Sequence, residues 1–226
     1  MDWSPLIVSI KTACLSIIVT FFLGLLAAWF VARSKSKFKG VIDSILMLPL
    51  ILPPTVIGFF LLVFFGKNGP IGSFLFESLN VSVIFTWTAT VIAATVVSFP
   101  LMYKTARGAF EQVDDSLIYS ARILGAKEWR VFWKVVVPVA WPGICAGAVL
   151  AFARGLGEFG ATLMIAGNIV GKTQTIPLAI YFAVEAGDMN KAYLWAGLIF
   201  SISLIGMILM NYWTQRQQKN QYGRGR

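Results

Sequence analysis

Arg154 and Glu158 stand four residues apart in a long, mostly apolar part of the sequence. Residues at this spacing share one face of a helix, so the two charges can pair. Charged side chains within a membrane span are costly, and they usually face a helix-bundle interior or a water-filled path. Two interpretations follow. The pair neutralises itself and locks helix contacts, or Arg154 helps a hydrated anion pass while Glu158 positions it. A bare carboxylate would repel a dianion, so we do not expect Glu158 to be a direct ligand.

Few other residues in the chain could carry out chemistry. The 226 residues include no histidine, which excludes Ser-His-Asp and Cys-His catalysis, His-ligated metals and histidine pH switches. The two cysteines, Cys14 and Cys145, lie in apolar runs far apart and form no CxxC motif, so we interpret them as small buried hydrophobic residues. The sequence shows no paired-carboxylate site and no metal-ligand cluster. It therefore predicts no catalytic residue, no cofactor and no metal, and it argues against a membrane enzyme.

The composition is that of an integral membrane protein. Hydrophobic residues make up 58% of the chain and charged residues 13%, and the mean hydropathy is +0.76. Soluble domains are roughly 45–50% apolar and about 25% charged. A soluble chain of this size could not bury so much apolar surface. We therefore expect an all-α polytopic fold in which residues 1–226 form a single membrane domain.

Long uncharged runs predict five transmembrane helices, since a span needs roughly 20 apolar residues. They are expected at about 10–32, 44–66, 81–103, 138–165 and 192–214. The fourth helix would hold Arg154 and Glu158. The apolar segment 173–184 is too short to span and predicts a short helix or a re-entrant segment. An alternative with six spans divides 135–171 into two.

The basic residues set the expected orientation. Of the 19 Lys and Arg residues, 14 fall in segments that five spans place on one side, and only four fall on the other. By the positive-inside rule the richer side is cytoplasmic, so the N-terminus is expected in the periplasm and the C-terminus in the cytoplasm. Six spans would export the basic C-terminal tail. Topology thus explains the net charge of +9, and nothing indicates a nucleic-acid partner.

The loop 104–134 is the one sizeable insertion outside the predicted spans, and its pattern indicates helix, break and helix. Asp114, Asp115 and Ser116 are candidate N-caps for a helix over Leu117–Leu124. Gly125 suits a left-handed C-cap, after which Ala126–Lys134 resumes as helix. One interpretation is an amphipathic helix on the membrane surface. The other is a docking element for a cytoplasmic partner.

Prolines interrupt the second and third predicted spans. Pro49, Pro53 and Pro54 lie in the second, and Pro100 lies in the third. Proline removes a backbone donor and bends a helix, so these residues predict kinks. The kinks can serve packing alone, or the bent helices can line a pathway that lacks fixed charges. The candidate pathway residues are Thr55, Ser98, Arg154, Glu158 and Thr162.

The loop also resembles a known family. Tyr119-Ser120-Ala121, Gly125, Val135 and Val137-Pro138 match the offsets of a motif, E-A-A-x3-G-x9-I-x-L-P, in permease subunits of bacterial ABC importers. In that family the loop forms a coupling helix that sits in a cleft of the ATPase subunit. The resemblance implies this role for Ser120–Trp129. The implied coupling residues are Ser120, Ala121, Gly125, Ala126 and Trp129. Tyr119 replaces the glutamate of the motif.

The segment Ala151–Thr162, together with Thr175–Tyr181, resembles the permease of molybdate ABC importers. The first segment is shared with sulfate/thiosulfate permeases. The resemblance implies the type I ABC importer permease fold and a multi-pass protein of the cell inner membrane, in contact with membrane lipid. It also implies a homodimer, a cytoplasmic ATPase dimer and a periplasmic molybdate-binding protein. The alternatives are a sulfate/thiosulfate or tungstate permease, or a secondary transporter, for which intramembrane acidic relays and repeated halves would be expected.

Overall fold

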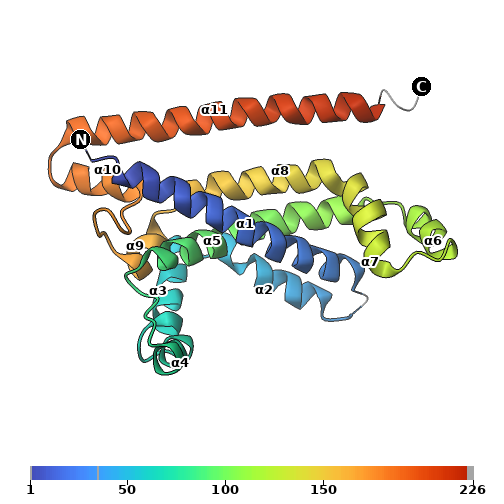
Figure 1. Cartoon of the computed structure of the whole chain (residues 1–226), viewed down its shortest axis with the longest axis horizontal. Helices are drawn as coiled ribbons and strands as arrows, with labels where there is room; N and C mark the ends of the chain where they lie inside the picture. The colour runs from blue at the N-terminus through green and yellow to red at the C-terminus, as the bar shows by residue number, and fades with distance from the viewer. Residues whose placement is uncertain (1, 35, 223–226) are drawn as a thin grey trace.

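A computed structural model describes residues 2–34 and 36–222, with the side chains of the last helix described through Ile208 and at Tyr212. Every regular element among these residues is helical, which confirms the all-α fold class (Figure 1). The elements are α1 Ser4–Arg33, α2 Lys39–Ile51, α3 Pro54–Phe65, α4 Pro70–Leu79, α5 Trp87–Glu111, α6 Asp115–Ile123, α7 Glu128–Val131, the π-helical η1 Phe132–Val136, α8 Val137–Leu156, α9 Gly160–Ala166, α10 Ile176–Glu185 and α11 Met189–Tyr222.

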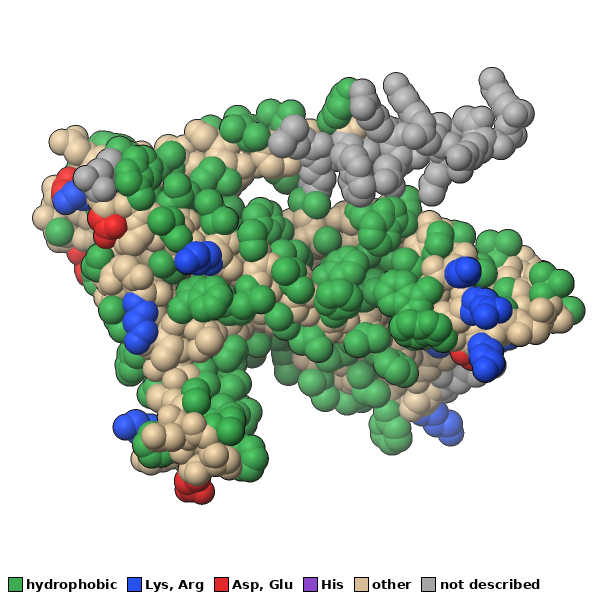
Figure 2. All heavy atoms as spheres, in the orientation of Figure 1, with side chains coloured by type: hydrophobic (Ala, Val, Ile, Leu, Met, Phe, Trp, Pro, Cys, Tyr) green, Lys and Arg blue, Asp and Glu red, His purple; other side chains and the backbone are tan. Residues whose placement is uncertain are grey.

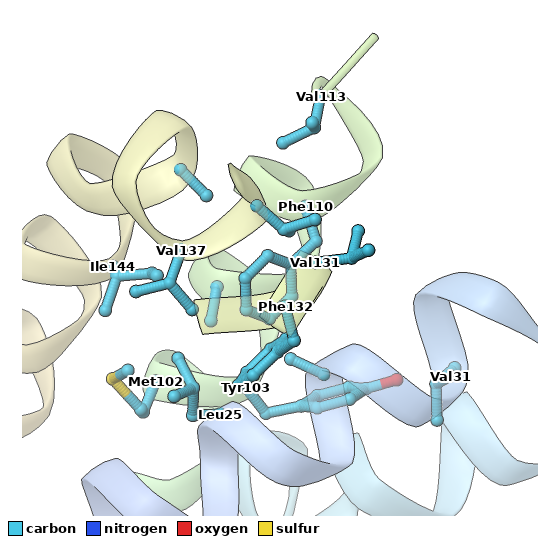
Figure 3. Packing of buried hydrophobic residues seen from close by; sticks show 14 of the residues in the cluster. Leu25, Val31, Met102, Tyr103, Phe110, Val113, Val131, Phe132, Val137 and Ile144 are labelled. Carbon is cyan, nitrogen blue, oxygen red and sulfur yellow. The ribbon is translucent and has the colours of Figure 1, made fainter. Parts of the chain in front are cut away.

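The helices α1, α5 and α8 pack along one another and form the centre of the molecule (Figure 1). Their main hydrophobic cluster lies toward the end of the bundle that carries α6 and α7, where Met102, Tyr103 and Ile144 are fully buried (Figure 3). Small residues let the backbones approach closely: a Cβ on Gly143 would lie 2.6 Å from the Cβ of Ala109. Close packing of this kind is what holds helices together in lipid.

The second predicted span is not one continuous helix. The chain turns by 110° between α2 and α3. Leu52 is extended, with ψ 143°, because the proline that follows disfavours the helical conformation. Pro54 then occupies the first turn of α3, where its missing N–H is tolerated. The bend that the prolines predicted in this span is therefore present, as a break between two helices, and α3 and α4 project away from the bundle (Figure 1).

The fourth predicted span also differs. One helical run extends from Glu128 through η1 to Leu156. It begins and ends earlier in the sequence than the helix expected over 138–165. Pro138 has no N–H for the carbonyl of Lys134, and the chain widens into the π-helix η1 at this place. After Leu156 the chain breaks, and α9 follows as a separate short helix. The expectation of one helix over 138–165 is therefore wrong.

The last two helices, α10 and α11, pack mainly on each other. α10 is the short helix expected over 173–184, and it packs on α11 through a small cluster of Ile176, Ala179 and Trp195. Only 11% of the stretch Met189–Ile208 is buried, and α11 lies along one edge of the molecule (Figure 1).

Four helices in the described residues are long and apolar enough to cross a membrane, or five if α2 and α3 together count as one span. The first and fifth predicted spans fall within α1 and α11. The third overlaps α5, which begins at Trp87 rather than at 81 and continues to Glu111. Hydrophobic side chains cover the middle of the visible face, and Lys and Arg gather mostly toward its ends (Figure 2). This distribution suits a molecule whose long axis crosses a bilayer.

Candidate translocation and coupling sites

Arg154 and Glu158 meet at the break between α8 and α9. Arg154 Nη1 donates to Glu158 Oε2 at 2.8 Å, and Ala161 N–H donates to Glu158 Oε1 at 2.8 Å. The Glu158 side chain is 2% exposed, whereas that of Arg154 is 30% exposed. Both carboxylate oxygens are therefore engaged inside the protein, while part of the guanidinium remains open.

This pair holds two helix ends of opposite polarity. Arg154 lies in the last turn of α8, and Glu158 lies just before the first turn of α9. A cation near a helix C-terminus and an anion near an N-terminus both complement the helix dipole. Glu158 also satisfies the N–H of Ala161, one of the first-turn donors without a partner in the helix. One ion pair and one capping hydrogen bond therefore hold the two helix ends together at the break, residues 157–159.

The start of α3 packs against this break. A Cβ on Gly160 would lie 3.1 Å from the Cβ of Pro54 and 3.3 Å from the backbone nitrogen of Thr55. A Cβ on Gly58 would lie 2.8 Å from the Cα of Ala161. Only glycine allows such a close approach, and the two glycines bring the two breaks of the chain together. The structure therefore places Thr55 beside Gly160, at the start of α9.

The other two candidate pathway hydroxyls are buried. Ser98 is 1% exposed; its Oγ donates to the Ala94 carbonyl at 2.6 Å and lies 3.2 Å from Thr20 Oγ1, across the contact between α5 and α1. Thr162, in α9, is also 1% exposed. Thr55 is exposed. Of the candidate hydroxyls, Thr55 alone is open to solvent in this conformation.

The loop between α5 and α8 has the predicted local structure. Asp114 caps α6 by accepting a hydrogen bond from Ser116 N–H at 2.8 Å, and this bond holds the pKa of the Asp114 carboxyl below its usual value. Gly125 has φ +76°. Gly125 N–H donates to the Arg122 carbonyl and Ala126 N–H to the Ala121 carbonyl, which is the Schellman pattern. The expected N-cap and left-handed C-cap are confirmed.

The tip of this loop exposes large apolar side chains outside the bundle. Ile123 and Leu124 are each 86% exposed, and Trp129 is 72% exposed. Ser120 and Gly125 are exposed as well, and Ala121 and Ala126 are partly buried, so the structure gathers all five predicted coupling residues at the turn from α6 to α7. The sequence reasoning missed Ile123 and Leu124. Two adjacent apolar residues before a C-cap glycine, in a helix that buries only Ile118, were the available signal.

An ionic network ties this loop to itself and to α1. Arg122 donates to both carboxylate oxygens of Glu128, from Nε at 2.6 Å and from Nη2 at 3.0 Å, and so spans the turn at Gly125. Arg33, at the end of α1, lies 3.7 Å from the same carboxylate. These side chains border a cavity of about 570 Å³ between α6, α1 and α5, with Trp29 and Phe110 in its wall. The network fixes the relative positions of α6 and α7.

The described residues contain no group of three or more His, Cys, Asp or Glu side chains that could hold a metal ion. Cys14 and Cys145 are free thiols, and Cys14 is exposed rather than buried, which corrects the expectation for that residue. An exposed apolar position of α1 faces lipid in a membrane, where a small cysteine is tolerated. The geometry offers a partly exposed guanidinium near the break between α8 and α9, and an exposed apolar tip at the turn from α6 to α7.

Comparison with known proteins identifies the family of this chain. The chain is 41% identical over 226 residues to the molybdenum transport system permease protein ModB of Escherichia coli K12, covering 99% of this chain and 97% of that protein. It is 40% identical over 220 residues to ModB of Haemophilus influenzae, covering 97% and 96%. A solved bacterial alginate ABC transporter, in complex with its alginate pentasaccharide-bound periplasmic protein, matches with a TM-score of 0.70 at 17% identity, covering 94% of this chain and 77% of that chain. This likeness confirms the ABC importer permease fold. The family model of the binding-protein-dependent transport system inner membrane component matches residues 20–219, and the chain belongs to that family.

Proposed function

We propose that this chain is the membrane subunit of an ATP-driven importer and forms the translocation pathway for molybdate. Its identity of 40–41% to molybdenum permeases extends over nearly the whole chain, and this observation carries the proposal. The chain itself would carry out no catalysis, because a separate partner subunit would hydrolyse ATP. Sulfate/thiosulfate and tungstate are the alternative substrates, because their dianions have the same shape and charge.

The pathway, in this proposal, runs past the junction of the two helix breaks. Arg154 offers the partly exposed end of its side chain at the end of α8, and Thr55 is exposed where α3 packs against the start of α9. Glu158 acts as a positioning residue because both of its oxygens are already bonded. Ser98 and Thr162 are buried and stabilise the packing of the helices that line the pathway. One half-exposed cation attracts a dianion without holding it tightly, which conduction requires.

The same surfaces support a homodimer. Arg154 and Thr55 open onto the surface of one chain, so a second copy placed against them would enclose a path between the protomers. The exposed apolar tip of α6–α7 would dock into the ATPase subunit on the cytoplasmic side, and a dimer of the chain would present two such tips to an ATPase dimer. A periplasmic binding protein would deliver the oxyanion at the opposite end. In this arrangement the N-terminus is periplasmic and the C-terminus is cytoplasmic.

Reconstitution tests the function. Purified chain, its co-encoded ATPase and binding protein are placed in proteoliposomes, and uptake of radiolabelled molybdate is followed with ATP or with a non-hydrolysable analogue. ATP-dependent uptake of molybdate without uptake of radiolabelled sulfate supports a molybdate importer. Uptake of sulfate in preference to molybdate would reassign the substrate to sulfate. Uptake without ATP, driven by an ion gradient, would show a secondary transporter instead.

A further inference from the structure

A second cationic feature lies at the end of the bundle opposite to α6 and α7. There a cavity of about 560 Å³ opens between the first turns of α1, the start of α5 and the turn that follows α9. It is lined by Ser4, Ile7, Val8, Lys11, Trp87, Gly171 and Lys172. Ser4, Val8 and Lys11 recur along one face of α1, so this helix forms one wall.

The opposite walls are held in place by hydrogen bonds. Thr173 is fully buried; its Oγ1 accepts from Ile169 N–H at 3.0 Å and donates to the Gly167 carbonyl at 3.2 Å. These bonds fix the turn that presents Lys172. The indole Nε1 of Trp87 donates to Thr12 Oγ1 at 3.0 Å, which fixes the Trp87 ring against α1. The two lysines are therefore presented by structured elements.

The charges of these two lysines are uncompensated. Among the described residues, no carboxylate lies within 4.0 Å of Lys11 or Lys172, whereas Lys191 at the same end pairs with Asp188 at 2.7 Å. Asp2, which lies just before α1, accepts hydrogen bonds from the Ser4 N–H at 2.9 Å and from the Ser4 hydroxyl at 2.7 Å. The cavity thus gathers two free ammonium groups beside apolar walls from Ile7, Val8 and Trp87.

We propose that this cavity is an outer binding site for a tetrahedral dianionic oxyanion, held between Lys11 and Lys172. Two ammonium groups supply the matching charge of +2 and six N–H donors, and a lysine ammonium binds such anions as a compact point charge. A concave surface of one sign with apolar walls concentrates the opposite ion. Both amines are exposed, so the site captures and releases rather than traps. The inference rests on the proposed import function, because only a substrate oxyanion arriving from this side would use the site.

Equilibrium binding tests the site directly. The full-length chain in neutral-lipid nanodiscs is titrated with radiolabelled molybdate in low salt, without ATPase or binding protein. We expect Lys11→Gln and Lys172→Gln each to weaken binding about fivefold and the double variant more than about tenfold, within the range by which a focused field concentrates an ion. Lys191→Gln, which removes a paired cation at the same end, is the matched control and should leave binding within about twofold. Sulfate should displace molybdate, and the monoanion perchlorate should do so at least about tenfold less well.

Several results would overturn the site. Unchanged binding in the double variant removes it, and an equal loss in Lys191→Gln shows a diffuse field rather than a site. Displacement by perchlorate as effective as by sulfate refutes the preference for a dianion. If the double variant binds molybdate normally but loses affinity for the loaded binding protein, this face docks a protein instead. Uptake by the reconstituted wild type is measured separately, so failure of the import function is distinguishable from failure of this site.

Discussion

The asymmetry of burial between Arg154 and Glu158 predicts unequal effects of removing each charge. Arg154→Ala leaves a carboxylate that is 2% exposed with only the Ala161 N–H as partner. Glu158→Gln keeps a carbonyl oxygen for that N–H and leaves a guanidinium that is 30% exposed. Water can solvate part of the remaining guanidinium, whereas the remaining carboxylate lies in a buried site and is solvated far less well.

The magnitudes follow from these environments. Removing one partner of a buried pair costs about 3–5 kcal/mol, and Arg154→Ala should approach this value. Glu158→Gln exchanges a charge-assisted hydrogen bond for a neutral one, a loss of about 1–2 kcal/mol. Glu158→Ala removes the cap of α9 as well and should fall between them. Each kcal/mol lowers the unfolding temperature by roughly 2–4 °C in a chain of this size, so Arg154→Ala should unfold some 6–20 °C below the wild type.

The assay is thermal unfolding of the purified variants in detergent, followed by the size-exclusion peak of the intact protein, with uptake normalised to assembled complex. Lys191→Ala, which removes an exposed ion pair, is the control and should cause no measurable shift. An unfolding temperature for Glu158→Gln at or below that of Arg154→Ala would refute the burial reasoning. If both variants equal the wild type, the two charges are solvated and the ion pair between α8 and α9 is not formed.

The double variant Arg154→Leu with Glu158→Leu separates stability from transport. Apolar replacement of both partners of a buried pair is often neutral for stability, although here the cap of α9 is lost as well. We therefore expect assembly close to that of Glu158→Ala. Recovery of uptake along with assembly would show that the pair is structural. Assembled but inactive complex is the result expected if Arg154 contacts the oxyanion.

Three further predictions concern the loop and the topology. Gly125→Trp should insert and dimerise but lose the ATPase subunit in co-purification, because a left-handed φ costs a bulky residue about 1–2 kcal/mol, whereas Gly125→Asn, which tolerates that φ, should retain it. Without the two native cysteines, a cysteine at Ser73 should react with an impermeant thiol reagent in intact cells and one at Ser36 should not; equal labelling would contradict the topology. Asp114→Ala should speed proteolysis within α6, while Asp114→Asn should not. Because a hydrogen bond lowers the pKa of Asp114, the charge strengthens the cap at neutral pH, and this added strength is lost as the pH falls through that lowered pKa, which leaves the neutral cap that asparagine also provides; an equal loss of protection at low pH in Asp114→Asn would contradict the role of the charge.

Local signals in the sequence were sufficient wherever a structural feature depends only on residues that are close in the sequence. The cap at Asp114, the left-handed residue at Gly125 and the short helix α10 each depend on neighbours within about six residues. Span positions were also recoverable, since an apolar run of sufficient length has few alternatives in a bilayer. The C-terminal end of α5 was displaced because its polar last turns continue as helix to Glu111.

The two breaks could not be placed from local signals because distant contacts decide them. Pro53 and Pro54 predict a bend, but its 110° angle requires α3 to lie against α9 through Gly58. Gly157 is compatible with a continuing helix. The chain breaks there because the Glu158 side chain caps the next helix, a contact that resembles an ordinary i, i+4 pair in the sequence. Likewise, Lys11 and Lys172 are 161 positions apart and meet only in the folded chain.

The meeting of the two breaks also explains how an anion could pass a site that contains a carboxylate. Helix N-termini carry partial positive charge, and two of them, those of α3 and α9, lie together here. Glu158 already caps the N-terminus of α9, so its negative charge is compensated by that helix end and by Arg154. No side chain caps the N-terminus of α3, where Thr55 is exposed. The local field that remains comes from an uncapped helix end and a partly neutralised guanidinium. In the proposed pathway, such a field would favour a dianion over neutral solutes and would be weak enough to let the dianion leave.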